Sequence, residues 1–122
     1  MLFRSTRGQD CHKTFEEILL AGLASDGGLF IPEKWPQVDL KAIKKCKSFV
    51  EIAHHIVPLF TDSSYTQEEV KEIVESTWHD FKSKNLIEIH NFDNNVFVAE
   101  LFHGPTAAFK DFGLQLLSLI HI

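Results

Sequence analysis

The apolar residues of this chain form helical patterns in three segments, at 14–24, 48–57 and 66–81. Each segment opens with a hydroxyl residue followed three positions later by glutamate, which is the pattern of a capping box: Thr14 with Glu17, Ser48 with Glu51, and Thr66 with Glu69. The last segment has the clearest periodicity, and one face of its helix would carry Val70, Ile73, Val74, Thr77, Trp78 and Phe81. The pattern therefore predicts three amphipathic helices, the second of which stops near Pro58.

Short runs rich in β-branched and aromatic residues predict strands at 29–31, 86–90 and 96–100. The last two runs are separated by the polar segment 91–95, whose Asn and Asp residues favour a turn. Two further helices are expected at about 40–45 and 112–117. The mixture of helices and strands, without an internal repeat or a low-complexity linker, predicts an α/β fold.

Composition and charge exclude several functional classes. The chain has 122 residues, of which 44% are hydrophobic and 24% charged, as is usual for a globular protein. A net charge of −5 gives no electrostatic footprint for nucleic acid, and the lysines at 41–47 are expected to form a solvated helix face. No apolar run approaches membrane-spanning length, and the first seven residues lack the apolar region of a secretory signal. We therefore expect a cytoplasmic protein with no nucleic-acid or membrane partner.

The spacing of cysteines and histidines predicts no metal site. Cys11 and Cys46 are far apart in the sequence and are expected to be reduced thiols. His54 and His55 are adjacent, so they would face different directions on a helix and could not share a metal ion. His103 differs because it precedes a Gly-Pro turn. We expect it to shape that turn through a hydrogen bond, with a position near a bound ligand as the alternative.

Lys110 lies in an apolar segment rich in small residues, 104–114, between a predicted strand and the last predicted helix. If the lysine is buried there, loss of hydration lowers its pKa, and the positive end of the helix dipole acts in the same direction. A neutral amine of this kind can form a Schiff base. The alternative is a lysine that reaches water along its own aliphatic stem. Of its neighbours, Phe109 is expected to pack and Asp111 to cap the following helix.

The segment around Lys110 resembles a pyridoxal-phosphate attachment site. Glu100, five intervening residues, Thr106 and then Ala-Ala-Phe-Lys-Asp-Phe-Gly-Leu are similar to the pattern shared by serine/threonine dehydratases and threonine synthases. The longer string that begins at Glu100, Glu-Leu-Phe-His-Gly-Pro-Thr, resembles threonine synthase rather than the dehydratases. Two blocks near the other end, at 5–8 and 25–32, are similar to the N-terminal region of the same family.

This resemblance implies a fold, an activity and a cofactor. The fold is the N-terminal region of a fold-type II, tryptophan-synthase-β-like enzyme, truncated, with an N-terminal α/β domain at 1–95 and the start of the catalytic domain at 96–122. The activity is conversion of O-phospho-L-homoserine and water to L-threonine and phosphate. Lys110 would be the catalytic residue, holding pyridoxal 5'-phosphate as a Schiff base, and Phe109 would be a weaker candidate for cofactor contact. No metal ion is implied, and the parent enzyme would be a monomer or a homodimer.

The six glycines of the chain form none of the glycine-rich loops that commonly bind a cofactor phosphate at a helix N-terminus. In threonine synthases that loop lies downstream of the lysine, so we expect this chain to be the N-terminal portion of a longer enzyme and inactive alone. Two alternatives stay open: a threonine-synthase-like phospho-lyase or serine/threonine dehydratase of the same fold, and a non-catalytic N-terminal module. Without the rest of the longer enzyme, the last helix would expose apolar residues and cause self-association. These residues are Leu114, Leu116, Leu117, Leu119 and Ile120.

Overall fold

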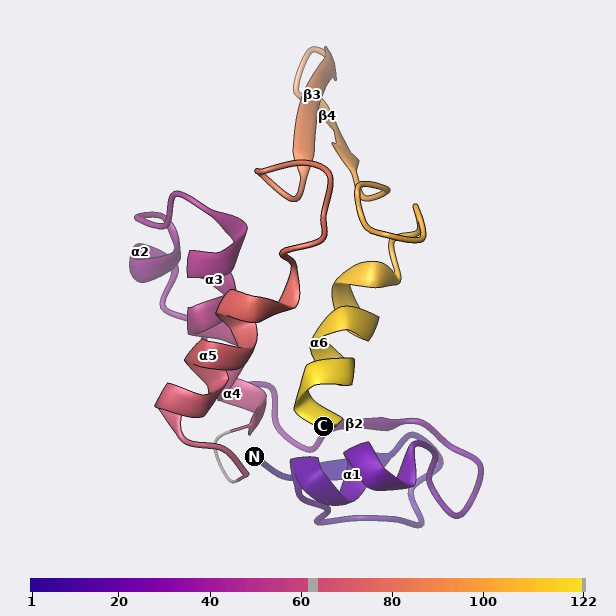
Figure 1. The fold of residues 1–122 in the computed structure, drawn as a ribbon. Helices are drawn as coiled ribbons and strands as arrows, with labels where there is room; N and C mark the ends of the chain where they lie inside the picture. The colour runs from indigo at the N-terminus through magenta and orange to yellow at the C-terminus, as the bar shows by residue number, and fades with distance from the viewer. Residues whose placement is uncertain (62–63, 122) are drawn as a thin grey trace.

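A computed structural model describes residues 1–61 and 64–121 of the chain. The elements, in chain order, are β1 (Phe3–Ser5), α1 (Phe15–Ala21), β2 (Phe30–Pro32), α2 (Leu40–Ile43), α3 (Phe49–Ile56), α4 (Pro58–Thr61), α5 (Gln67–Thr77), β3 (Glu88–Asp93), β4 (Val96–Glu100) and α6 (Asp111–His121). Helices α3, α5 and α6 form the middle of the molecule, and the β3–β4 hairpin projects from one end (Figure 1). The mixed α/β class predicted from the sequence is confirmed.

The three helices predicted from capping patterns are present. Thr14 and Thr66 each accept a hydrogen bond from the backbone N–H three residues later, and the glutamates at those positions bond back to complete capping boxes. Ser48 also caps α3, but the Glu51 carboxylate accepts from the backbone N–H of Lys47 instead. A short helix that was not predicted, α4, begins at Pro58, because proline fits the first helical position as well as it ends a preceding helix.

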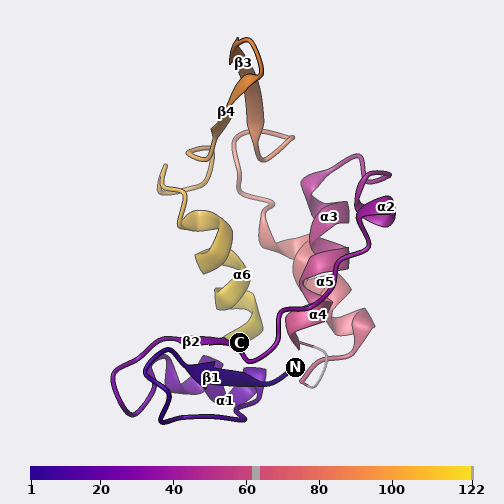
Figure 2. The same cartoon turned by 180° about the vertical axis from the view of Figure 1, so that it is seen from behind.

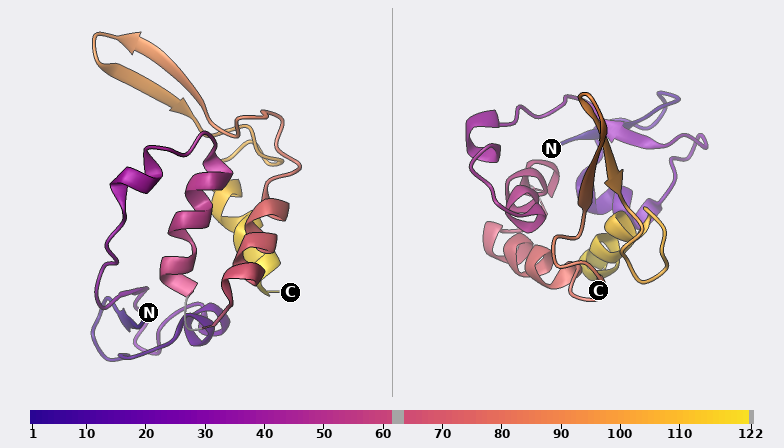
Figure 3. Two further views of the ribbon diagram at one scale, coloured as in Figure 1. Left: turned by 90° about the vertical axis from the view of Figure 1, so that its left-hand side faces the viewer. Right: turned by 90° about the horizontal axis from the view of Figure 1, so that it is seen from above.

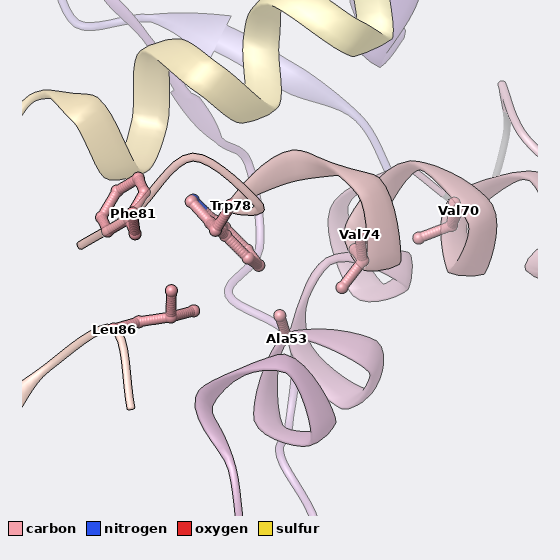
Figure 4. Packing of buried hydrophobic residues seen from close by; sticks show 6 residues of the cluster. All are labelled: Ala53, Val70, Val74, Trp78, Phe81 and Leu86. Atoms are coloured by element: carbon pink, nitrogen blue, oxygen red, sulfur yellow. The ribbon is translucent and has the colours of Figure 1, made fainter. Parts of the chain in front are cut away.

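The core lies where α3, α5 and the start of α6 meet. Six buried residues form one cluster, drawn in Figure 4: Ala53, Val70, Val74, Trp78, Phe81 and Leu86. Four of them lie on the apolar face predicted at 66–81, and Val74 is completely buried. Helix α6 joins through Phe112, whose ring makes edge contacts with Phe49 and Phe81 and whose carbonyl accepts from Trp78 Nε1 at 3.1 Å. The helix that follows Lys110 is thus tied to the core at its second residue.

The strands form two separate antiparallel pairs, β1 with β2 and β3 with β4. Strand β2 begins one residue later than predicted and includes Pro32, which pairs with Phe3. The sequence did not predict β1, whose three residues carry too short a pattern. With α1, this first pair lies at the end of the molecule opposite the hairpin (Figure 2).

The two N-terminal blocks that resemble threonine synthase pack against each other. Ser5 Oγ donates to the Asp26 carboxylate at 2.7 Å, and Arg7 Nη1 donates to the Asp26 carbonyl at 2.8 Å. The backbone of Gly28 also lies against Ser5, since a Cβ atom at residue 28 would overlap Ser5 Oγ. The hydrogen bond from Ser5 is the main cause that holds the pKa of Asp26 below its ordinary value. Two sequence blocks that lie on either side of α1 in the chain therefore form one turn structure.

The β3–β4 hairpin extends away from the helices and packs neither face against them (Figure 3). Strand β4 has the predicted bounds, but β3 begins at Glu88 rather than at residue 86, because Leu86 adopts φ 64° and turns into the core. Large apolar side chains on the hairpin are 46% to 78% exposed: Ile89, Phe92, Val96, Phe97 and Val98. Isolated two-stranded hairpins are marginally stable in water, and a large exposed apolar patch is typical of a binding surface. We therefore expect this hairpin to bind another apolar surface.

The expected exposure of α6 is partly wrong. Leu114 and Leu117 are 57% and 42% exposed, but Ile120 is only 8% exposed and Leu116 packs against the core cluster. The helix rotates these two residues inward because Phe112 fixes its first turn on Trp78. The larger exposed apolar surface therefore belongs to the hairpin.

We expect the isolated chain to self-associate through this hairpin, and Phe97→Thr to weaken the association at least about tenfold, because burying a phenylalanine side chain contributes about 1.5–3 kcal/mol. Threonine keeps the strand propensity of the position. Sedimentation velocity over a concentration series measures the effect. Leu29→Thr, at a site 62% exposed but remote from the hairpin, is the control. Equal association of both variants would show that the hairpin is not the interface.

Within the described residues, none of the helices combines the length and the apolar character needed to cross a bilayer.

Candidate active site

The predicted lysine lies at the end of a compact loop, 101–110, between β4 and α6. Two backbone hydrogen bonds fold this loop: Ala107 N–H donates to the Gly104 carbonyl at 3.1 Å, and Asp111 N–H donates to the Ala108 carbonyl at 3.0 Å. Ala107 adopts φ 57°, a left-handed conformation that reverses the chain. The predicted Gly-Pro turn is therefore present, as the first part of a longer structure that leads into α6.

Lys110 lies at the N-terminus of α6, as predicted, and its carbonyl accepts the N–H of Leu114 at 2.9 Å. Its side chain is exposed, so of the two alternatives the structure has the lysine that reaches water and not the buried one. The expected packing of Phe109 is wrong, because this side chain is 66% exposed. The reason is helical geometry: Asp111 and Phe112 occupy the inward positions, which leaves the two preceding residues facing outward. The Lys110 amine makes no hydrogen bond or ion pair with any described residue.

Asp111 is the most buried side chain of the loop region, with 1% exposure. Its Oδ1 accepts from the Thr106 hydroxyl at 2.7 Å, and its Oδ2 accepts from the Thr106 backbone N–H at 2.9 Å. The expectation that Asp111 caps the following helix is therefore wrong, because its carboxylate binds the preceding loop. The hydrogen bond from the Thr106 hydroxyl is the main cause that holds the pKa of Asp111 below its ordinary value, so the group is ionised at neutral pH.

Gly104 lies directly against this carboxylate. A Cβ atom at residue 104 would overlap Asp111 Oδ2 and lie 2.8 Å from Asp111 Cγ, closer than real Cβ contacts allow. The residue is a glycine because the backbone must approach the Asp111 side chain, and its φ is not positive. The side chain that follows Lys110 is thus contacted by both Gly104 and Thr106.

His103 fixes the other end of the loop. Its Nε2 lies 2.9 Å from Glu100 Oε2, and the two side chains are 19% and 27% exposed. The other oxygen of Glu100 lies 3.2 Å from Nε2 of His90 on β3, and the His103 carbonyl accepts the N–H of Lys82 at 2.9 Å. The hydrogen bond expected for His103 is therefore present. The contact between Glu100 and His90 was not predicted, because it depends on the register of β3 against β4.

The histidines, cysteines and carboxylates described by the structure contain no group of three that could hold a metal ion. Cys11 and Cys46 are both free thiols, Cys11 exposed and Cys46 half-buried.

Comparison with known proteins identifies the family. The family profile described as "Threonine synthase N terminus" matches residues 2–78, more than half of the chain. The chain belongs to the threonine synthase family. Threonine synthase from Pseudomonas aeruginosa is 43% identical over 119 residues, which cover 96% of this chain and 25% of that protein. Threonine synthase from Schizosaccharomyces pombe is 42% identical over 118 residues, which cover 94% of this chain and 23% of that protein.

The fold agrees with the sequence comparison. A crystal structure of pyridoxal-phosphate-bound threonine synthase from Brucella melitensis superimposes with a TM-score of 0.90 at 38% identity, over 98% of this chain and 26% of that one. This threonine synthase family chain therefore spans about a quarter of the length of the relatives it matches. Both comparisons extend past residue 78, so they are not confined to the region that the family profile matches.

Proposed function

We propose that this chain is part of a threonine synthase that uses pyridoxal 5'-phosphate to convert O-phospho-L-homoserine and water to L-threonine and phosphate. The observation that carries the proposal is Lys110, which stands in the sequence typical of the family's cofactor lysine, at a helix N-terminus and at the end of an ordered loop. The fold around it is shared with a threonine synthase that binds this cofactor, at a TM-score of 0.90.

One residue of the chain, Lys110, is suited to attach such a cofactor. The exposed Lys110 amine has no partner among the described residues, so it is accessible to an aldehyde, and covalent attachment there is the chemistry of lysine with this group. Phe109 beside it is exposed and is proposed to contact the cofactor. When bound, pyridoxal phosphate supplies an electron sink for negative charge at the substrate Cα. Lys110 Nζ, once free, is the group of this chain that can accept and return the Cα proton.

The remaining ligands are proposed to come from sequence that this chain does not contain. Its six glycines form none of the glycine-rich loops that commonly bind a cofactor phosphate. We propose an N-terminal domain at 1–95 and the beginning of the catalytic domain at 96–122, with the enzyme acting as a monomer or homodimer on a small-molecule substrate. The two free thiols fit a reducing compartment, so the proposed location is the cytoplasm. The chain alone is expected to be inactive.

A chimera tests the proposal. The first quarter of the Pseudomonas aeruginosa threonine synthase is replaced by this chain, its 43% identical counterpart, and the product is assayed for equal release of phosphate and L-threonine from O-phospho-L-homoserine. We expect turnover. The matched control is the same exchange with the corresponding Schizosaccharomyces pombe segment. An active control beside a folded but inactive chimera would contradict the proposed function and favour a non-catalytic module.

A further inference from the structure

We infer that Asp111 and Thr106 form a clamp that positions Lys110, so that both are positioning residues of the enzyme. The inference rests on the proposed function and deepens it, because it concerns how the chain places the reacting amine. The clamp is defined as the two hydrogen bonds between the Thr106 hydroxyl and backbone N–H and the Asp111 carboxylate, 2.7 and 2.9 Å long.

Lys110 itself has nothing that would fix its place. Its side chain is exposed and makes no hydrogen bond or ion pair with the described residues, so its location is set by its backbone. On the C-terminal side, that backbone is held by Asp111, at 1% exposure, and by Phe112, whose carbonyl binds the buried Trp78 indole. The residue after the lysine is therefore buried, and the next residue is bound to the core.

On the N-terminal side, the same carboxylate binds Thr106, in addition to the backbone hydrogen bond from the Ala107 N–H to the Gly104 carbonyl. Thr106 is itself exposed, so its side chain gains little from burial, yet both of its donors point to Asp111. Gly104 packs on the carboxylate from the other side, with no room for a Cβ atom. One ionised group thus closes the segment 106–111 into a ring, and Lys110 is the residue of that ring next to the closure.

The closure matters for chemistry because hydrogen bonds to an ionised acceptor are short and strong, and a small displacement of a reacting group is costly. Without the clamp, the segment before Lys110 would keep its backbone hydrogen bonds but lose both bonds between Thr106 and the start of α6. The amine would sample more positions, and fewer of them would be reactive. Loss of the clamp is therefore expected to lower kcat more than it changes KM.

The test combines two preparations. In the 122-residue chain, amide hydrogen exchange is measured at Thr106; in the chimera, kcat, KM and borohydride trapping of pyridoxal phosphate on Lys110 are measured. Asp111→Asn neutralises the acceptor and leaves it a single oxygen, Thr106→Val removes the hydroxyl bond of the clamp, and Thr106→Ser keeps the hydroxyl. Glu68→Gln is the matched control, because it neutralises an exposed acidic residue in the first turn of α5, a helix of the same length as α6.

We expect Asp111→Asn to speed exchange at the Thr106 amide at least about tenfold, since a hydrogen bond to a charged group is lost. In the chimera, Asp111→Asn and Thr106→Val should each lower kcat by up to about 10²-fold and slow trapping at Lys110, with a smaller change in KM. Thr106→Ser should restore most of the activity, and Glu68→Gln should match the wild type.

The clamp is overturned as a positioning device if Asp111→Asn and Thr106→Val lower only the melting temperature while kcat and trapping stay at wild-type values. It is overturned as a structure if exchange at Thr106 is unchanged in Asp111→Asn. Failure of the proposed function has a different signature, because the wild-type chimera would then not trap the cofactor at Lys110. Exchange in the isolated chain would still decide whether the clamp exists.

Discussion

Replacing Lys110 by alanine in the chimera is expected to remove covalent cofactor attachment and to lower turnover at least about 10³-fold, because one substitution deletes both the attachment point and the group proposed to move the Cα proton. The fold should not change, since the Lys110 side chain is exposed and has no partner among the described residues. Phosphate release from O-phospho-L-homoserine and the cofactor absorbance after gel filtration measure the two losses.

Lys82→Ala is the control for this experiment. Lys82 is also exposed and contacts the same loop, but only through its backbone N–H, which binds the His103 carbonyl at 2.9 Å and remains in the variant. Its turnover should equal that of the wild type. A Lys110→Ala protein that retains covalently bound cofactor, or that loses no more activity than Lys82→Ala, would be incompatible with the assigned role of Lys110.

Trp78→Ala should have the largest effect on the stability of the chain, a loss of about 3–5 kcal/mol, which is the usual cost of truncating a buried tryptophan or phenylalanine. Trp78 is 6% exposed, contacts Phe49 edge-on at a centroid distance of 4.9 Å and donates to the Phe112 carbonyl. The substitution removes the hydrogen bond from Trp78 to α6 as well as core volume. Urea denaturation followed by circular dichroism measures the change in the free energy of unfolding.

Trp35→Ala provides the matched comparison, because Trp35 is 68% exposed and, among residues 1–61 and 64–121, has a single ring contact, with Phe60. Substitutions at such surface positions usually change stability by less than about 0.5 kcal/mol. Equal losses in the two variants would show that the core described around Trp78 does not dominate the stability of the chain.

Local signals in the sequence predicted the helices well. The hydroxyl and glutamate pairs at 14–17 and 66–69 interact within one turn of helix, so their hydrogen bonds depend on neighbouring residues. Both pairs form capping boxes in the structure. The apolar face of α5 was predicted for the same reason, since a period of 3.6 residues repeats over three turns. Strand β1 was missed because its three residues are a strand only through pairing with β2, far along the chain.

The candidate site shows the same division between local and distant information. The position of Lys110 at a helix start follows from its neighbours in sequence, and the structure has it there. Its exposure does not follow, because an apolar stretch does not reveal which residues turn inward. The partner of Asp111 does not follow from the neighbouring sequence either. An acidic residue at a helix start usually binds the first turn of the helix, whereas here Thr106 in the preceding loop donates to both carboxylate oxygens. The close packing of Gly104 depends on that same return.

The exposed hairpin was the least predictable feature. The apolar residues of 86–100 were expected to form strands, and nothing in their pattern indicated that both faces would remain uncovered by the rest of the chain. A strand with apolar residues on both faces is typical of a sheet buried between layers. The part of the chain that the structure describes supplies no such layers around β3 and β4, while the relatives are about four times as long.

Borohydride reduction of the chimera in the presence of pyridoxal phosphate, followed by peptide mass spectrometry, tests the role of Lys110 most directly, with the other lysines as internal controls. Selective labelling of Lys110 is the predicted result, and Lys110→Ala should abolish it. The isolated chain should label its exposed lysines without preference, because Lys110 is exposed there. Labelling of the chimera that is spread evenly over surface lysines, or concentrated at a different lysine of this chain, would contradict the assignment of Lys110 as the cofactor-binding residue.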